Sequence, residues 1–324
     1  MQDYNQPKKL LITGGAGFIG SNLVESFINS EEFSLIRVLD NLSSGYLRNI
    51  ESFMSNPKFE FINGDIRDKT TTRKACEGID LISHHAALGS VPRSINDPIT
   101  STEVNVNGFL NILWAAKEFN IKRIVYASSS SVYGDLTDSP KKEDRIGKVL
   151  SPYAANKMCN ELFAETFARN YDMDLIGLRY FNVFGPKQDP DSSYAAVIPL
   201  FFKAALNLQS PIIYGDGSIS RDFTPVKNVI QMNYKVLLSS KLPSRHTVLN
   251  IACGQTTTLN NLWEMIEEVA GIKVAPYYGA HRKGDVYQSL ADISLARKAF
   301  DYNPTIDLTE ELKLTFDYYK NFFK

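Results

Sequence analysis

The sequence predicts an α/β fold built on a doubly wound parallel sheet, with a smaller, interleaved C-terminal lobe. Strand-like apolar runs alternate with helical patterns in the first half of the chain, as parallel strands joined by crossover helices require. A glycine-rich turn follows the first run, and loops rich in Gly, Pro, Asp and Ser interrupt the chain beyond about residue 180. The predicted strands are residues 10–13, 35–39, 59–62, 79–83, 121–127 and 174–179.

The first turn lies in the segment LITGGAGFIG at residues 11–20, where Gly15, Gly17 and Gly20 fit G-x-G-x-x-G. Gly14 adds a further glycine, and a helix is expected to start at residues 21–24. Residues without a Cβ let the backbone approach a pyrophosphate at a helix N-terminus. The pattern therefore predicts a Rossmann sheet with a dinucleotide site.

The second predicted strand is followed by Asp40, which lies 20 residues after Gly20. A carboxylate at this position accepts hydrogen bonds from the adenosine ribose and repels a 2′-phosphate. Asn41 follows instead of an arginine, so NAD is favoured over NADP. Arg37 and Arg48 lie close enough in sequence to leave that choice open.

Two domains are expected, and they interleave. Residues 1–180 are predicted to form the NAD-binding Rossmann domain, and residues 181–324 mainly the substrate-binding lobe. The apolar run at 246–252 still has the composition of a buried strand, so the segment at about 225–255 is expected to rejoin the first sheet.

Helical patterns at 103–119 and 152–170 carry much apolar surface. They are either an interface in a homodimer, paired across a twofold axis, or ordinary core helices, because periodicity alone does not separate the two.

Composition argues against several kinds of partner. The 324 residues include 35 basic and 36 acidic side chains, a net charge of −1 that gives no electrostatic case for nucleic acid or an anionic membrane. No apolar stretch approaches the ~18 residues of a membrane span, and we expect no signal peptide at the start. Cys76, Cys159 and Cys253 are scattered and odd in number, which suits reduced thiols in the cytoplasm. Four histidines without Cys/His spacing predict no metal site, and the pair His84–His85 is expected to be structural.

A candidate catalytic pair lies on the helix that begins after Ser151, the expected N-cap, and Pro152. Tyr153 and Lys157 are spaced i, i+4 and share a face of this helix. A free phenol has a pKa of ~10, so we expect the neighbouring ammonium and the positive ring of NAD⁺ to lower the pKa of Tyr153. Upstream, four serines at 128–131 follow the strand at 121–127, where α/β sheets bind ligands.

The chain resembles the extended short-chain dehydrogenase/reductase family over nearly its whole length. The matching segments are residues 13–20, 63–68, 84–87, the serine run, Tyr153-x-x-x-Lys157 and residues 179–186. The resemblance places Asp65 and Ile66 beside the adenine, Ala86 and Ala87 under the cofactor, and Lys157 on the nicotinamide ribose. Ser129 becomes the catalytic serine, with a slip of one position left open. The full set of expected cofactor-binding residues is Gly14, Gly17, Phe18, Ile19, Gly20, Asp40, Asn41, Ser43, Gly45, Asp65, Ile66, Ala86, Ala87, Tyr153, Lys157, Tyr180 and Val183.

The residues after the catalytic serine narrow the reaction that the resemblance implies. Dehydratases of this family carry Asp-Glu there and decarboxylating members a Glu, whereas this chain has Ser130 and Ser131. Simple 4-epimerisation therefore fits better. In that reaction Tyr153 removes the C4 hydroxyl proton while hydride passes to NAD⁺, and the 4-keto sugar turns over before hydride returns. Ser130 and Ser131 are expected to face the sugar.

The resemblance also assigns the substrate side. Arg221 and Arg282 are expected to clamp the pyrophosphate by charge-assisted bonds, and Ile212 and Tyr214 to wall the uracil. Ser289 stands where glucose-restricted members have a bulky Tyr, which leaves room for an acetamido group. The other expected substrate-binding residues are Ser90, Asn182, Gln188, Ala196, Val197 and Asp285.

The expected function is therefore NAD-dependent 4-epimerisation of a UDP-N-acetylhexosamine for surface polysaccharide synthesis. Alternatives are a 4-epimerase of UDP-N-acetylglucosaminuronate, UDP-glucuronate or UDP-glucose, or a non-catalytic nucleotide-sugar sensor. One departure from the family is Lys227, which stands in place of a usual acid, as Pro225 does of an aromatic residue. We expect this position to support helix capping and lobe packing, on which the geometry of Arg221 depends.

Overall fold

The computed structural model describes residues 6–192, 195–280 and 287–322 of the chain. In these ranges a seven-stranded sheet runs in the order β11-β6-β5-β4-β1-β2-β3, and every neighbouring pair is parallel. The predicted fold class is confirmed. The strands of this sheet are β1 (Lys8–Thr13), β2 (Phe33–Asp40), β3 (Phe59–Asn63), β4 (Leu81–His84), β5 (Arg123–Ser129), β6 (Asp174–Tyr180) and β11 (His246–Ile251).

The strand order reverses beside β1, because the chain first adds β2 and β3 on one side and then returns to place β4 on the other. Thr13, the last residue of β1, is the register partner of His84, the last residue of β4. Ligands of open α/β sheets bind outside the carboxyl ends of strands at such a switch point.

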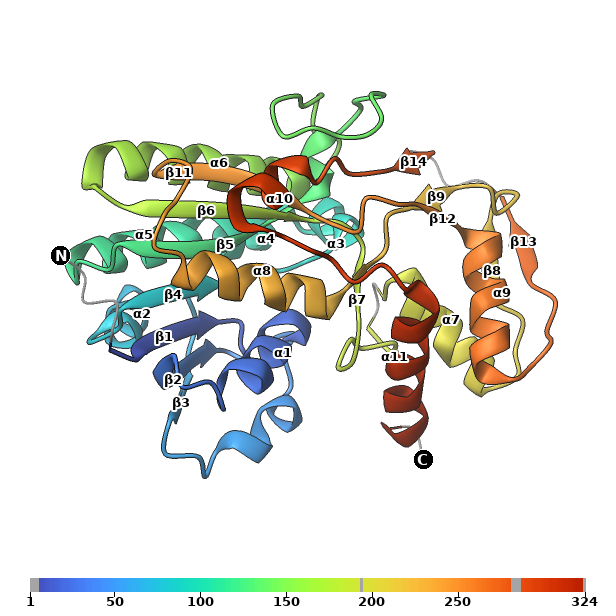
Figure 1. Ribbon diagram of the computed structural model, residues 1–324, viewed down its shortest axis with the longest axis horizontal. Coiled ribbons are helices and arrows are strands. Elements are labelled where there is room, and N and C mark those ends of the chain that lie inside the picture. Colours follow the sequence, from blue (N-terminus) through green and yellow to red (C-terminus); the bar gives the residue numbers. More distant parts are fainter. Residues whose placement is uncertain (1–5, 193–194, 281–286, 323–324) are drawn as a thin grey trace.

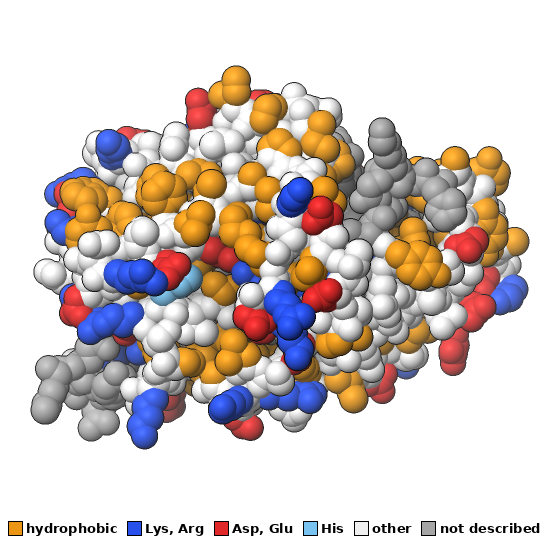
Figure 2. All heavy atoms as spheres, turned by 90° about the horizontal axis from the view of Figure 1, so that it is seen from above, with side chains coloured by type: hydrophobic (Ala, Val, Ile, Leu, Met, Phe, Trp, Pro, Cys, Tyr) orange, Lys and Arg blue, Asp and Glu red, His pale blue; other side chains and the backbone are white. Residues whose placement is uncertain are grey.

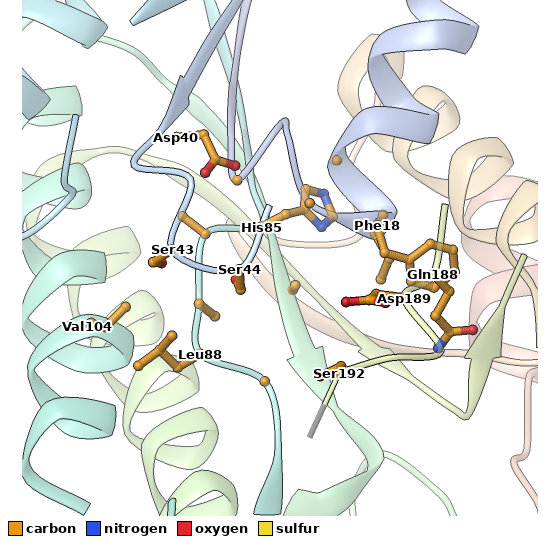
Figure 3. Close-up of a pocket in the computed structure, with 18 of the residues that line it drawn as sticks. Phe18, Asp40, Ser43, Ser44, His85, Leu88, Val104, Gln188, Asp189 and Ser192 are labelled. Carbon is orange, nitrogen blue, oxygen red and sulfur yellow. The ribbon is translucent and has the colours of Figure 1, made fainter. Parts of the chain in front are cut away.

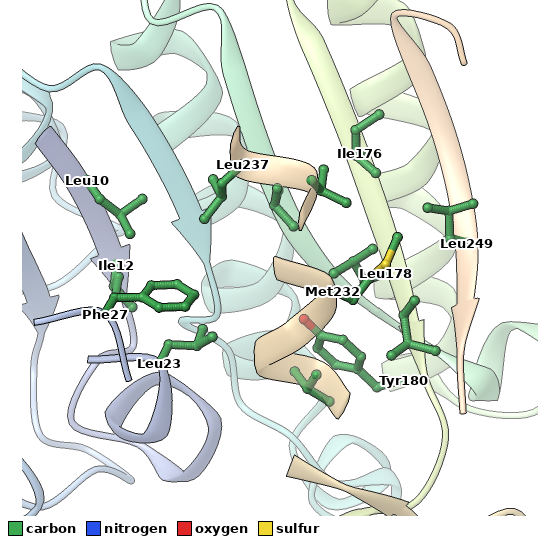
Figure 4. Close-up of a cluster of buried hydrophobic side chains, with 14 of the residues drawn as sticks. Leu10, Ile12, Leu23, Phe27, Ile176, Leu178, Tyr180, Met232, Leu237 and Leu249 are labelled. Atoms are coloured by element: carbon green, nitrogen blue, oxygen red, sulfur yellow. The ribbon is translucent and has the colours of Figure 1, made fainter. Parts of the chain in front are cut away.

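Helices cover both faces of the sheet (Figure 1). One face is covered by α1 (Phe18–Phe27), α8 (Val226–Leu238) and α10 (Ser294–Phe300). The other is covered by α2 (Lys69–Cys76), α5 (Gly108–Glu118) and α6 (Pro152–Tyr171). Figure 4 shows the first layer, where Leu10 and Ile12 of β1 meet Phe27 of α1 and Met232 of α8 lies near Leu178 of β6. Burying each such side chain contributes about 1.5–3 kcal/mol.

Local signals account for several helix ends. Asp68 caps α2 by accepting hydrogen bonds from the backbone N–H groups of Thr70 and Thr71. The predicted cap of α6 is present, since Ser151 Oγ accepts from the N–H of Ala154. The short helices between β4 and α5 are α3 (Val91–Asn96) and α4 (Pro98–Thr102).

The helix expected at 103–119 divides into a π-helical turn, Glu103–Asn107, and α5. A Cβ at Gly108, where α5 begins, would lie 2.4 Å from Ile66 Cδ1, so the helix packs closely against the segment after β3. Short 3₁₀ turns occur at Leu47–Asn49, Glu51–Phe53 and Ser130–Tyr133.

The distal lobe packs α7 (Val197–Leu206), α9 (Leu259–Ala270) and α11 (Leu308–Phe322) around their own apolar core (Figure 1). Seven short strands in the described ranges form three further small sheets, β10-β7, β12-β9-β14 and β13-β8. They are β7 (Val183–Phe184), β8 (Ile212–Tyr214), β9 (Ser220–Arg221), β10 (Thr224–Pro225), β12 (Thr257–Thr258), β13 (Tyr277–Gly279) and β14 (Gln288–Ser289). Within the described ranges, each helix is too short or too polar to span a bilayer.

Candidate active site

A cavity of about 680 Å³ opens at the carboxyl ends of the sheet strands, between the sheet domain and the distal lobe (Figure 3). Most of the expected site residues meet in its wall. These are Gly14, Gly17, Phe18, Ile19, Gly20, Asp40, Asn41, Ser43, Asp65, Ile66, Ala86, Ala87, Ser129, Tyr153, Lys157, Tyr180, Asn182, Val183, Gln188 and Ala196.

Other expected residues lie outside this wall. They are Gly45, Ser90, Ser130, Ser131, Val197, Ile212, Tyr214, Arg221 and Ser289. Arg282 and Asp285 fall outside the residues that the structure describes.

The glycine turn has little room for side chains. A Cβ at Gly14 would lie 2.6 Å from the backbone nitrogen of Ala86, and one at Gly20 would lie 2.1 Å from the carbonyl oxygen of Gly14. Gly17 is the N-cap of α1 and has no side-chain cap, so the first turn of α1 faces the cavity with its backbone N–H groups. This arrangement suits an anion, and the turn therefore fits the pyrophosphate of a dinucleotide.

Asp40, at the end of β2, holds this turn in place. Its carboxylate accepts hydrogen bonds from the N–H groups of Ala16 at 2.9 Å and Leu42 at 2.8 Å. Burial raises the pKa of Asp40, and these hydrogen bonds oppose that shift. Gly45 packs beneath the turn, where a Cβ would lie 2.7 Å from the carbonyl carbon of Ala16. Gly45 therefore lies behind the cavity wall, whereas Ser43 is part of the wall.

Asp65 also lines the cavity. Its carboxylate accepts hydrogen bonds from Arg67 and from Asn41 Nδ2 at 3.0 Å, and the bond from Arg67 has the largest share in lowering the pKa of Asp65. Ile66 follows it in the wall.

The candidate catalytic residues converge from two elements. Ser129 ends β5, and Tyr153 and Lys157 lie in the first two turns of α6. The side chains of Ser129 and Tyr153 lie close enough to interact. Lys157 Nζ donates to the carbonyl of Ala127 at 2.7 Å and lies 5.8 Å from the centre of the Tyr153 ring.

Burial dominates the ionisation of this pair. It raises the pKa of Tyr153, while the Ser129 side chain has a smaller, opposite effect. It also lowers the pKa of Lys157 to about 8. The ammonium and the positive ring of NAD⁺ are expected to lower the pKa of Tyr153, whereas among the protein's own groups the net direction is upward, because burial disfavours the phenolate.

The other serines of the run point in different directions. Ser128 Oγ donates to Glu161 in the protein interior. Ser131 Oγ is buried and has no hydrogen-bond partner among the described residues. Ser130 opens the 3₁₀ turn that follows Ser129.

The distal lobe brings Arg221 beside Ser289, which are register partners in β9 and β14. Asn182 connects this region to the cavity, because it lines the wall and its Nδ2 donates to the carbonyl of Asp222 at 3.1 Å. Ile212 is 53% exposed on β8. Pro225 and Lys227 are the two positions at which the sequence departs from the family pattern. Pro225 is the N-cap of α8, and Lys227 forms an ion pair with Glu311 of α11.

Several residues of the wall were not predicted. They include His85, Leu88, Arg93, Tyr46 and Asp189. His85 stacks on Tyr180 with 6.0 Å between ring centres, and burial lowers its pKa to about 3. No group of three His, Cys, Asp or Glu side chains in the described part of the chain is arranged to hold a metal ion.

Residues 10–252 match the model of a family described as NAD dependent epimerase/dehydratase family. A curated relative from Methanocaldococcus jannaschii, "Putative UDP-glucose 4-epimerase", is 37% identical over 314 residues, covering 96% of this chain and 98% of the relative. The solved "UDP-N-acetylglucosamine 4-epimerase from Methanobrevibacter ruminantium M1 in complex with UDP-N-acetylmuramic acid" has a TM-score of 0.90 and 38% identity, covering 98% of this chain and 99% of that chain. The UDP-glucuronic acid 4-epimerase from Bacillus cereus, in complex with UDP-glucuronic acid and NAD, has a TM-score of 0.88 and 30% identity, covering 97% and 99%.

Proposed function

This chain belongs to the NAD dependent epimerase/dehydratase family, and from that premise we propose that it interconverts UDP-GlcNAc and UDP-GalNAc by reversible epimerisation at C4. NAD is the cofactor of this family. The observation that carries the proposal is the convergence of Ser129, Tyr153 and the buried Lys157 with the glycine turn in the wall of one cavity.

In the proposed reaction Tyr153 accepts the proton of the C4 hydroxyl, and the neighbouring hydroxyl of Ser129 shares that proton. Bound NAD supplies the reversible hydride acceptor, and its positive charge favours the phenolate. Lys157, held by the carbonyl of Ala127, supplies a second positive charge and a donor for the nicotinamide ribose. The 4-keto sugar turns within the cavity, and Tyr153 returns the proton.

The cavity wall supports the assignment of NAD. Asp40, the glycine turn and Asp65 are proposed to bind the adenosine half, and Ala86 and Ala87 to support the nicotinamide half. The remaining proposed cofactor contacts are Asn41, Ser43, Gly45, Ile66, Tyr180 and Val183.

On the substrate side, we assign the nucleotide to the distal lobe and the hexose to the serine turn. Residues 1–180, rejoined by about 225–255, are then the NAD domain and residues 181–324 mainly the UDP-sugar lobe. Arg221 is proposed to bind the diphosphate. Arg282 and Asp285 keep their proposed roles from the resemblance. The other proposed substrate contacts are Ser90, Ser130, Ser131, Asn182, Gln188, Ala196, Val197, Ile212 and Tyr214.

The sugar specificity is assigned through Ser289. Its pairing with Arg221 puts a small side chain next to the proposed diphosphate site.

Ser130 and Ser131 provide no carboxylate for dehydration. Relatives named for UDP-glucose and UDP-glucuronic acid supply the rival substrates. A sensor without turnover is disfavoured because Ser129, Tyr153 and Lys157 are all present at one site.

The decisive experiment uses coupled assays of the purified protein to compare its turnover of four substrates: UDP-GlcNAc, UDP-N-acetylglucosaminuronate, UDP-glucuronate and UDP-glucose. We expect the highest kcat/KM with UDP-GlcNAc and its C4 epimer, and loss of turnover in Tyr153→Phe. Turnover of a uronate alone, or unchanged inversion in Tyr153→Phe, would overturn the assignment of substrate or of mechanism respectively.

Ser289→Tyr tests the specificity determinant. The added ring should abolish activity on the acetamido sugar and spare UDP-glucose, whereas Ser289→Ala, which removes the hydroxyl without adding bulk, should retain both activities. Equal losses on both sugars in Ser289→Tyr contradict the steric argument.

We also propose a homodimer in the cytoplasm, acting on precursors of surface polysaccharide. The three cysteines are all free thiols, which supports a reducing compartment. Trp114 of α5 and Leu162 and Phe163 of α6 support the dimer, because they are exposed large apolar side chains. Figure 2 shows the molecule from above the view of Figure 1, with hydrophobic side chains spread over this face.

A further inference from the structure

A buried ion pair lies directly behind the catalytic residues. Glu161 is on α6, one turn after Lys157 and two turns after Tyr153, and Arg179 is on β6. Arg179 donates from Nε to Glu161 Oε1 at 3.0 Å and from Nη2 to Oε2 at 2.8 Å. The two side chains are 4% and 7% exposed. Desolvation offsets much of the attraction in such a pair, so its presence is weak evidence of stabilisation and leaves another role to be found.

Glu161 also connects α6 to the strand that carries Ser129. Ser128 Oγ donates to Glu161 Oε1 at 2.5 Å, and Ser128 immediately precedes Ser129 on β5. One carboxylate therefore contacts β5 next to the serine and belongs to the helix that carries Tyr153 and Lys157. Rotation or translation of α6 against β5 would break this contact.

Arg179 extends the connection to the serine turn. Its Nη1 donates to the hydroxyl of Tyr133 at 3.0 Å and to the carbonyl of Glu143 at 3.1 Å. Tyr133 closes the 3₁₀ turn that contains Ser130 and Ser131, and its hydroxyl donates to Asn250 Oδ1 of β11 at 2.6 Å. The ion pair thus joins three strands, α6 and the turn after Ser129.

The surroundings of Lys157 give Glu161 an electrostatic role as well. Burial lowers the pKa of Lys157, and the negative charge of Glu161 opposes this shift. From β4 and the residue after it, His84 and His85 face the lysine, and both have lowered pKa values because they are buried. Tyr153 lies on the same helix, and β5 offers the carbonyl of Ala127.

Two further charged groups belong to this cluster: Arg179, which pairs with Glu161, and Glu143, whose carboxyl also interacts with Arg179. Loss of the Glu161 charge would therefore remove the attraction that favours the ammonium of Lys157 and weaken the compensation of Arg179.

We propose that Glu161, clamped by Arg179, is a positioning residue that holds Ser129 against Tyr153 and Lys157 and places a negative charge one helical turn from the ammonium. The inference rests on the proposed function of these three residues. Glu161 lies outside the cavity wall and acts only through its neighbours.

Glu161→Gln tests both parts, because the amide keeps the volume and loses the charge. We expect kcat to fall 10- to 100-fold while KM for the UDP-sugar and the Kd of NAD stay within twofold. The alkaline limb of the kcat profile should move about one pH unit lower. The matched control is Glu165→Gln, one turn further along α6, where the carboxylate is 41% exposed and pairs with Arg169. It should leave kcat and the profile unchanged.

A second readout needs no turnover. In protein labelled with ¹³C at lysine Cε, the Lys157 signal, assigned with Lys157→Arg, should titrate at lower pH in Glu161→Gln than in the wild type. An unshifted titration contradicts the inference whether or not the wild type is active. A shifted titration in a wild type without epimerase activity contradicts the proposed function alone.

Milder variants cover a failure of Glu161→Gln to fold. Ser128→Ala removes only the contact with β5 and should lower kcat about threefold or more with little change in the alkaline limb. Glu161→Met combined with Arg179→Met replaces the pair with apolar side chains of similar length. If this double variant folds and retains wild-type kcat and pH profile, the pair is merely structural and the inference is wrong.

Discussion

The hydroxyl of Tyr46 donates a hydrogen bond of 2.5 Å to the carboxylate of Asp189, although the two residues are 143 positions apart. Tyr46 lies in the loop after β2 and Asp189 precedes α7, and both line the cavity. Figure 3 shows Asp189 in the wall near Phe18. The bond therefore connects the loop after β2 to the segment that precedes α7, across the cavity.

Tyr46→Phe should accelerate dissociation of NAD. The variant keeps the ring, with Arg48 3.9 Å from its centre, and loses only the bond to Asp189. A hydrogen bond to a charged group contributes about 1.5–3 kcal/mol, and partial exposure reduces that figure, so we expect a 3- to 10-fold faster release. Stopped-flow fluorescence of NADH measures it. Tyr234→Phe, on α8, is the control and should leave release unchanged. Equal rates in Tyr46→Phe and the wild type would show that the bond does not retain the cofactor.

Asp40→Ala should reduce both stability and NAD affinity. It leaves the N–H groups of Ala16 and Leu42 without their acceptor, which costs about 1–3 kcal/mol in the free energy of unfolding. Asp40→Asn should lose less stability and should narrow the preference for NAD over NADP, because it removes the charge that repels a 2′-phosphate. Urea unfolding and cofactor titration measure the two effects. An unaltered NAD:NADP ratio in Asp40→Asn contradicts the assigned role.

Lys157→Met should abolish activity without lowering stability at neutral pH. The pKa of Lys157 is about 8 in the folded protein and lies below its ordinary value of 10.5. Below pH 8 both folded and unfolded chains carry the charge, and its burial opposes folding by about 3 kcal/mol. Between about pH 8 and 10.5 the folded protein loses the proton first, so this penalty disappears as pH rises.

The measurement is the difference in the free energy of unfolding between Lys157→Met and the wild type at pH 7 and pH 10. Groups common to both proteins cancel in that difference. The variant's relative stability should be higher at pH 7 than at pH 10, and kcat should fall at least 100-fold. If the difference in the free energy of unfolding does not change with pH, burial does not destabilise the charged form of Lys157.

Leu162→Glu should convert the proposed dimer to monomers. Leu162 is 56% exposed on α6, and a carboxylate there would have to be desolvated at an interface. Leu314→Glu on α11, at a site 55% exposed, is the matched control. Sedimentation velocity distinguishes the two. A Leu162→Glu protein that still sediments as a dimer places the interface elsewhere.

The sheet was predictable because its strands are short, apolar and separated by helical patterns. Each of the six predicted strands overlaps an observed one with ends within two residues. The π-helical turn at Glu103–Asn107 was not predictable, because the helical pattern at 103–119 continues through it without a marker residue.

The nucleotide half of the cavity was largely predictable, since its residues follow strand ends and the glycine motif. Contacts between residues far apart in the sequence were not predictable. Tyr46 with Asp189 and Glu161 with Arg179 meet only after the sheet has formed, and neither pair has a spacing that marks it. The net direction of the Tyr153 pKa was also missed, because i, i+4 spacing shows the lysine and does not show how deeply the phenol is buried.

β11 pairs with β6 along six residues, yet it enters the sheet only after the chain has built β8, β9 and β10 of the distal lobe. The chain thus passes repeatedly between the two lobes, so neither lobe is formed by one continuous segment that could be expressed alone. A fragment ending at residue 180 would present the whole of β6 as a bare strand edge, the kind of surface that recruits foreign strands. Sheet completion during synthesis must therefore wait until residue 251 has emerged.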